Sequence, residues 1–157
     1  MPDDHTFFRR ILDSRQIHNS GRAIIFDSSR RRILVERNLG AREGYVAFPG
    51  GGIELGETLE DCISRELDEE IAARVAEFEF LFVVENLIPF EGEYVHGIEL
   101  YCEVRLESDE IESQLGGYEF PWLALDGLSR VDLRPWIVRD HVVDGSYRSI
   151  RHLVSWD

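Results

Sequence analysis

The stretch from Gly51 to Ala73 (GGIELGETLEDCISRELDEEIAA) constrains the fold more than any other part of this 157-residue chain. It opens with glycines, which allow left-handed backbone conformations and close approach to a ligand. Thr58 is a favourable helix N-cap, and Asp61 three residues later can complete a capping box. Apolar residues then recur at every fourth position. We therefore predict a helix from Thr58 to about Ala73, with one buried stripe formed by Leu59, Ile63, Leu67 and Ile71.

Another face of this predicted helix is acidic. Glu66, Glu69 and Glu70 stand at i, i+3 and i+4, which places them on one side of a helix. Three neighbouring carboxylates repel one another unless a cation lies between them, and Mg²⁺ or Mn²⁺ prefers such oxygen ligands. Taken alone, however, an acidic helix face is more simply a solvated surface. Arg65 is placed to orient a carboxylate, and Glu57 lies in the turn before the helix.

The whole stretch resembles the Nudix box, in which glycine, glutamate and an Arg-Glu-apolar-any-Glu-Glu motif stand at fixed spacings. Phe48-Pro49-Gly50 also resembles the family's usual lead-in. One position departs, because Ala72 replaces the glycine that normally lets the chain turn at the helix end. We expect this alanine to prolong the helix slightly without removing metal binding. The residues that match the box are Gly51, Glu57, Arg65, Glu66, Leu67, Glu69, Glu70 and Ala73.

The resemblance implies a metal-dependent hydrolase that cleaves a diphosphate linkage in a nucleoside diphosphate joined to another moiety. Within that class we favour a nucleotide sugar or an ADP-ribose-like compound, with a modified nucleoside triphosphate next. The implied cofactor is Mg²⁺ (or Mn²⁺), which lowers the pKa of bound water and neutralises phosphate charge. The implied metal ligands are the Gly51 carbonyl, Glu66, Glu69 and Glu70.

The resemblance also implies roles for individual side chains. Glu69 is the first choice for activating water, while Arg65 and Glu57 take orienting roles. A further acid from outside the box often completes such sites, and Glu112 and Glu119 are the candidates here. The implied catalytic set is therefore Glu69, Glu66, Arg65 and Glu57.

The remaining pattern predicts strands on both sides of this helix and a second helix near the C-terminus. Their order indicates an α/β (α+β) fold, a mixed sheet with a helix on each side, as in the α/β/α sandwich of the Nudix family. Residues 147–156 could form a last strand or an irregular tail. Tyr45, Phe82 and Arg22 are candidates to line a pocket. The expected elements are a hairpin of 23–26 with 33–35, strands at 78–84, 97–106 and 120–125, and a helix from Pro135 to about 143.

Length and charge narrow the class of protein. The chain has the usual size of one domain, so we expect a single domain over 1–157 with residues 1–18 as an N-terminal extension. The net charge of −14 disfavours a nucleic-acid polymer as partner, because binding there depends on Lys and Arg. The first ten residues lack the apolar core of a signal peptide, no apolar run could span a bilayer, and two cysteines are too few for a disulfide framework. We expect a soluble cytoplasmic protein without a membrane partner, acting on a small nucleotide-like molecule. A homodimer is implied only by the family resemblance.

Two other functions remain open at this level. The chain could be a non-catalytic nucleotide-binding or regulatory module on the same fold. It could also be an acidic interaction protein without a metal site, although the matched box positions disfavour that. Turnover in the presence of Mg²⁺ or Mn²⁺ separates these alternatives.

Overall fold

The computed structural model describes residues 4–41 and 44–157, so the first three residues of the predicted N-terminal extension lie outside it. Within these residues there are three α-helices, α1 (Asp4–Ser14), α2 (Leu59–Ile71) and α3 (Trp136–Val143). Two short 3₁₀ helices, η1 (Leu128–Arg130) and η2 (Ser146–Ser149), flank α3. The strands are β1 (His18–Ile25), β2 (Arg32–Leu34), β3 (Glu36–Asn38), β4 (Val46–Ala47), β5 (Gly50–Gly52), β6 (Val75–Phe90), β7 (Glu93–Leu106), β8 (Tyr118–Glu119), β9 (Trp122–Ala124), β10 (Leu133–Arg134) and β11 (His152–Ser155).

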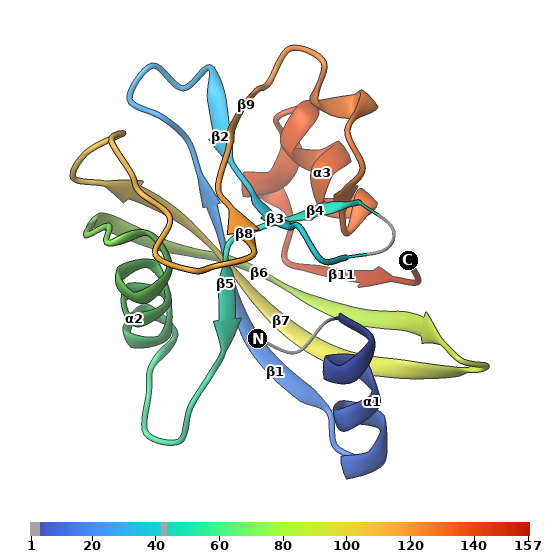
Figure 1. Cartoon of the computed structure of the whole chain (residues 1–157). Helices are drawn as coiled ribbons and strands as arrows, with labels where there is room; N and C mark the ends of the chain where they lie inside the picture. The colour runs from blue at the N-terminus through green and yellow to red at the C-terminus, as the bar shows by residue number, and fades with distance from the viewer. Residues whose placement is uncertain (1–3, 42–43) are drawn as a thin grey trace.

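The largest sheet is mixed and has the strand order β11-β6-β7-β1-β5 (Figure 1). β6 and β7 form its long antiparallel centre, whereas β1 runs parallel to β7 and β11 runs parallel to β6. β5 pairs antiparallel with β1 at the opposite edge and leads directly towards α2. A four-stranded sheet, β10-β4-β3-β8, and the pair β2-β9 complete the strand framework.

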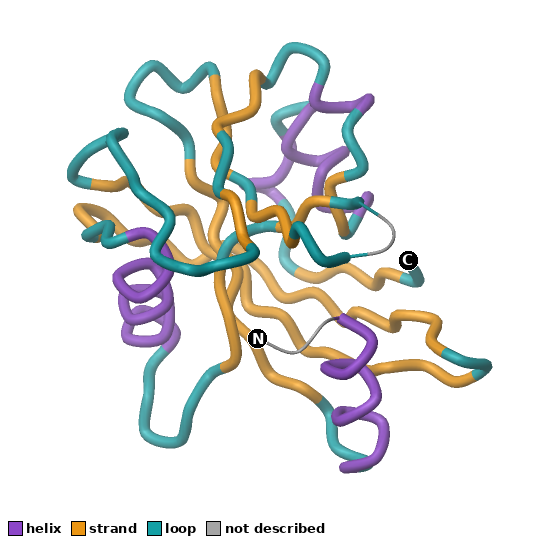
Figure 2. Tube along the Cα trace, in the orientation of Figure 1, coloured by secondary structure: helices purple, strands orange, loops and turns teal. Residues whose placement is uncertain are grey.

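Two hydrophobic cores lie on opposite faces of the main sheet, because alternate residues of a strand point to opposite sides. On β1, Ala23 and Ile25 pack in the core that contains Ile63 and Leu67 of α2. Ile24 belongs to the other core, which includes side chains of α3. The tube view shows the two helices on either side of the strands (Figure 2). The predicted α/β arrangement with a helix on each side of a mixed sheet is therefore confirmed.

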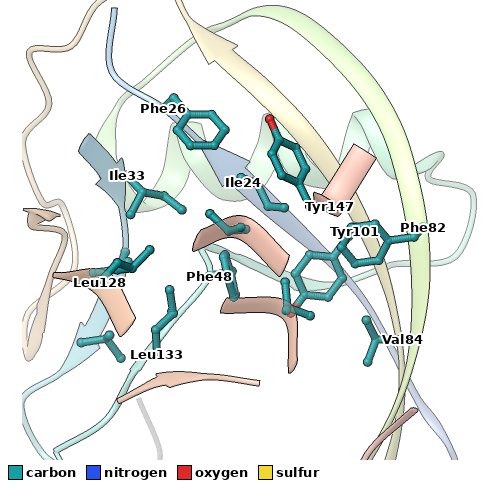
Figure 3. Packing of buried hydrophobic residues seen from close by; sticks show 14 residues of the cluster. Ile24, Phe26, Ile33, Phe48, Phe82, Val84, Tyr101, Leu128, Leu133 and Tyr147 are labelled. Atoms are coloured by element: carbon teal, nitrogen blue, oxygen red, sulfur yellow. The ribbon is translucent and has the colours of Figure 1, made fainter. Parts of the chain in front are cut away.

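Aromatic packing fills the core on the α3 side (Figure 3). The rings of Phe82 and Tyr101 are stacked with their centroids 5.1 Å apart, and Phe48 meets Tyr101 edge-on at 5.5 Å. Phe82 is fully buried. Our suggestion that it lines a pocket is therefore wrong, since the side chain is part of the core.

Most predicted elements are present, but several are longer than their patterns indicated. The predicted hairpin of 23–26 with 33–35 is an exception, since it is reduced to a single bridge between Phe26 and Ile33. β1 pairs instead with β5 and β7, and β2 pairs with β9. The strand expected at 78–84 is an inner part of β6, and the strand expected at 97–106 is the C-terminal part of β7. Both strands continue to a shared turn at residues 91–92. The C-terminal tail resolves into η2 followed by β11.

Helix α1 was not predicted. Leu12 is its buried residue, and Phe8 contacts Phe90 at the end of β6 with the ring centroids 5.6 Å apart. His5 and Arg9 both reach Glu91 in the β6–β7 turn. The helix thus lies against the tip of the long hairpin (Figure 1). The division into one domain with an N-terminal extension stays a prediction.

The structure shows no helix long and apolar enough to cross a membrane within the part of the chain that it describes. Both cysteines, Cys62 and Cys102, are buried free thiols.

Candidate active site

The box begins on a strand edge and continues into α2, and the local sequence explains this path. Thr58 caps the helix by accepting from the backbone N–H of Asp61, whose carboxylate accepts from the Thr58 N–H at 2.9 Å. The predicted capping box is therefore confirmed. Ile63 and Leu67 anchor the helix in the core, so its remaining surface is fixed relative to β5.

Two glycines of β5 lie in close contact with other parts of the protein. Gly50 has a φ of +146°, and a Cβ there would lie 2.0 Å from the carbonyl oxygen of Gly21. A Cβ on Gly51 would lie 2.2 Å from Oε1 of Glu66. The carboxylate of Glu66 thus occupies the space above a bare backbone. The Gly51 carbonyl oxygen lies 3.6 Å from the thiol sulfur of Cys62.

Arg65 fixes two carboxylates of the box. Its Nε and Nη2 donate to the two oxygens of Glu57 at 2.6 and 3.0 Å, and its Nη1 donates to Glu66 at 2.8 Å. Nη2 also donates to the carbonyl oxygen of Gly52 at 3.1 Å. These bonds hold the pKa of Glu57 at about 2, well below its ordinary value. A planar guanidinium suits this role because it serves several oxygens in one plane.

The three glutamates of α2 differ sharply in environment. Glu70 is buried, and burial, followed by the nearby charges of Glu36 and Glu66, raises its pKa to about 9. Its Oε2 is buried and makes no hydrogen bond within residues 4–41 and 44–157. The side chain of Glu66 is 15% exposed and that of Glu69 is 59% exposed, with an Oε2 of Glu69 lying 3.5 Å from Arg65.

Glu36 also belongs to this region, although it was not among the residues predicted for the site. Glu36, on β3, lies close enough to Glu66 and Glu70 to act on both electrostatically. Burial raises its pKa to about 7, the charge of Glu66 adds to that rise, and Arg22 opposes it. The one available signal was a single acid directly after the buried run 33–35, which is weak evidence by itself.

The two acids expected from outside the box lie elsewhere. Glu119 is half-exposed on β8, with its carboxylate 3.5 Å from Arg37. Glu112 is exposed in the segment that passes the C-terminal end of α2, where the N–H of Gln114 donates to the Glu70 carbonyl at 2.7 Å. The structure groups neither side chain with Glu66 and Glu70.

The donor set fits a hard divalent cation. It offers carboxylate oxygens, and those of Glu36 and Glu70 include one buried oxygen each that has no hydrogen-bond partner in the described residues. The carboxylate of Glu66 lies against Gly51, where a Cβ would collide with it. Among those residues no three His, Cys, Asp or Glu side chains are already gathered as a cage. Arg65 holds Glu66, and Glu69 extends into solvent, so rotation of these side chains is needed to close around an ion.

Ala72 does not prolong the helix, so that expectation is wrong. The helix ends at Ile71, and Ala72 adopts the left-handed conformation, with φ 51° and ψ 32°. Its N–H donates to Asp68 at 3.0 Å, and the N–H of Ala73 donates to Leu67 at 3.2 Å. The bond from Ala72 to Asp68 is that of the left-handed C-cap motif, in which the left-handed residue is usually glycine. The turn carries Ala73 into the core beside Leu67, and that packing overrides the preference of alanine for helix.

Comparisons with known proteins agree with this geometry. A model of the NUDIX domain matches residues 17–141. The NAD-capped RNA hydrolase NudC of Pseudomonas aeruginosa (strain LESB58) is 30% identical over 118 residues, covering 71% of this chain but 38% of that relative. The chain therefore spans well under half the length of the curated relative it matches.

Solved structures share the fold at lower identity. The MutT protein of Bacillus halodurans superposes with a TM-score of 0.67 at 21% identity, covering 81% of this chain and 82% of that one. A NUDIX hydrolase from Nitrosomonas europaea gives 0.68 at 16%, covering 85% and 92%. The NUDIX domain of Shewanella oneidensis NrtR, complexed with ADP ribose, gives 0.64 at 17%, covering 82% and 85%. By its matched domain and its fold, the chain belongs to the Nudix hydrolase family.

Proposed function

We propose that this protein hydrolyses a diphosphate linkage in a small nucleotide-like molecule, with Mg²⁺ or Mn²⁺ as cofactor. The observation that carries the proposal is the arrangement around α2, where Glu66 lies over the bare backbone of Gly51 and Glu70 holds a buried, unpaired carboxylate oxygen in the described structure. A net charge of −14 makes a cation necessary before an anionic substrate can approach these acids.

Each residue of the site has a proposed role. Glu66, Glu69, Glu70 and the Gly51 carbonyl would hold the cation, which when bound neutralises phosphate oxygens and lowers the pKa of coordinated water. Glu69 is our candidate to accept the proton of the attacking water, because its carboxylate is the most exposed of the three. Arg65 keeps Glu57 and Glu66 in fixed orientations, so little reorganisation is needed during the reaction.

The preferred substrate is an ADP-ribose-like compound or a nucleotide sugar. One structural relative is complexed with ADP ribose, and the name of the curated relative refers to an NAD cap on RNA. ADP-ribose and NAD share a diphosphate that joins adenosine to a second ribose. The acidic charge of this chain favours the small molecule over the RNA.

Turnover of a defined panel tests the proposal. Wild type is incubated with Mg²⁺ or Mn²⁺ and ADP-ribose, nucleotide sugars, NAD, a short NAD-capped RNA and modified nucleoside triphosphates. We expect cleavage of ADP-ribose or of nucleotide sugars, and loss of activity when EDTA is added. The turnover rate of Glu69→Gln should be lower than that of wild type by about a hundredfold or more. Glu60→Gln, on the same helix but outside the box positions, is the matched control and should retain activity.

Other outcomes separate the competing functions. Saturable binding of ADP-ribose without turnover of any compound would favour a non-catalytic module and contradict our proposal. Preference for the NAD-capped RNA over free NAD would contradict the small-molecule assignment alone. The homodimer and the cytoplasmic location stay predictions, and sedimentation analysis of the protein tests the first.

A further inference from the structure

Glu36 is a half-buried acid with one buried carboxylate oxygen, and the Nudix box does not contain it. It lies on β3, where it pairs with Ala47 of β4, the strand that leads towards Gly50 and Gly51. The fold therefore brings it to the box from a separate element. Its Oε2 is inaccessible and accepts no hydrogen bond from any residue that the structure describes.

The surroundings of Glu36 contain other acids and one deeply placed cation. Glu36 interacts electrostatically with Glu66 and Glu70, and the charge of Asp4 also acts on Glu36. Arg22 attracts both Glu36 and Glu70, but its Nη1 donates to the carbonyl oxygen of Phe48 at 3.3 Å. Glu36 and Glu70 thus influence each other electrostatically, and each keeps one buried oxygen without a donor in the described residues.

Buried acids with structural roles in this protein look different. Glu99 accepts from Asn86 at 3.1 Å with one oxygen and from the Tyr101 hydroxyl at 3.0 Å with the other. The buried Asp27 accepts from Arg32 and from the backbone N–H of Arg31. A buried carboxylate that only supports the fold is normally satisfied in this way, because leaving it unpaired costs free energy. Glu36 and Glu70 each keep a buried oxygen without such a donor in the described residues.

We propose that Glu36 is a further ligand of the divalent cation, supplied from β3 and sharing the ion with Glu70. Two unpaired carboxylate oxygens from different elements are the donors that a hard divalent cation requires, and an ion between them removes their repulsion. This inference rests on the proposed function, since it assumes a cation at the box. It assigns to Glu36 the place that the sequence suggested for Glu112 or Glu119.

Binding of Mn²⁺ to the intact protein tests this assignment without any substrate. Free Mn²⁺ is followed by electron paramagnetic resonance during titration of wild type, Glu36→Gln and Glu66→Gln. We expect Glu36→Gln to weaken Mn²⁺ binding about tenfold or more, as loss of a ligand or its close support does. Glu119→Gln, a half-exposed acid on the neighbouring strand β8, is the matched control and should bind as wild type does.

Thermal unfolding shows whether the effect is merely structural. Without metal, Glu36→Gln should melt at or above the wild-type temperature because a repulsive buried charge is gone, while the increase produced by Mn²⁺ should shrink. Glu36→Asp keeps the charge but withdraws it by one methylene, and it should also weaken Mn²⁺ binding in a folded protein. Unchanged Mn²⁺ affinity in Glu36→Gln alongside a loss in Glu66→Gln overturns the role of Glu36 and leaves the proposed function standing. Unchanged affinity in both variants overturns both.

Discussion

Replacing Ala72 by glycine should stabilise the protein, although alanine is ordinarily the better residue near a helix. Ala72 is exposed and holds φ at 51°, in the left-handed region. A side chain in that conformation costs roughly 1–2 kcal/mol. Glycine has no such cost, but it gives the unfolded chain more freedom, which offsets about 0.4–1 kcal/mol of the gain.

The expected net increase in the free energy of unfolding is roughly 0.8 kcal/mol, the difference between the midpoints of these two ranges. For a protein of this size that corresponds to an increase in Tm of about 1–4 °C. Thermal and urea unfolding of wild type and Ala72→Gly in metal-free buffer measure it. The urea m-value should not change, since the same surface is exposed on unfolding.

Ala73→Gly is the matched control, because it makes the same chemical change at the next residue. Ala73 is buried and is not among the described residues with positive φ. Glycine there removes a packed methyl group and adds unfolded-state freedom, so we expect destabilisation of about 1 kcal/mol. If Ala72→Gly destabilises as much as Ala73→Gly, the left-handed turn is not strained and our explanation of the helix end is refuted.

Three further predictions concern the box. Gly51→Ala should fold but bind Mn²⁺ weakly, because its Cβ would lie 2.2 Å from Oε1 of Glu66 and displace that carboxylate. Gly116→Ala is the control, since it has open space around it and should bind Mn²⁺ normally; a manganese titration compares the two variants. Arg65→Lys should lower kcat about 10–100-fold with little change in KM, because one ammonium cannot hold both carboxylates; steady-state kinetics that match wild type would refute this. Because the pKa of Glu57 is lowered, its ion pair with Arg65 stabilises the fold above about pH 4.5, and this stabilisation is lost as the pH falls through about 2. The Tm difference between wild type and Glu57→Gln should therefore shrink between pH 4.5 and 2, and a difference that widens would contradict this.

The parts of the structure that follow from short-range patterns could be predicted. The capping box at Thr58 and the apolar stripe of α2 are local features, and the helix begins where they indicate. The turn that follows β1 is likewise local, although β1 and β2 share only the single bridge between Phe26 and Ile33. The box glutamates lie on one helix, as their spacing indicates, although Glu69 extends into solvent whereas Glu70 is buried.

The remaining features depend on contacts between distant segments. Glu36 joins the site only because β3 pairs with β4 and β4 leads to β5, which no local pattern specifies. Helix α1 is held by the β6–β7 turn, through Phe90 and Glu91, and its own sequence gives a short and strongly charged helix. At Ala72, core packing of the following residue decides the backbone against local propensity.

A crystal grown with Mn²⁺ tests the central claim most directly, because anomalous scattering locates the ion independently of activity. We predict an anomalous peak beside α2, in contact with the carboxylates of Glu66 and Glu70 and near the carbonyl of Gly51, with Glu69 turned towards it. A crystal grown with saturating Mn²⁺ could instead show no anomalous peak there, with Glu66 still paired with Arg65 and Glu69 extended into solvent. That result would contradict the account.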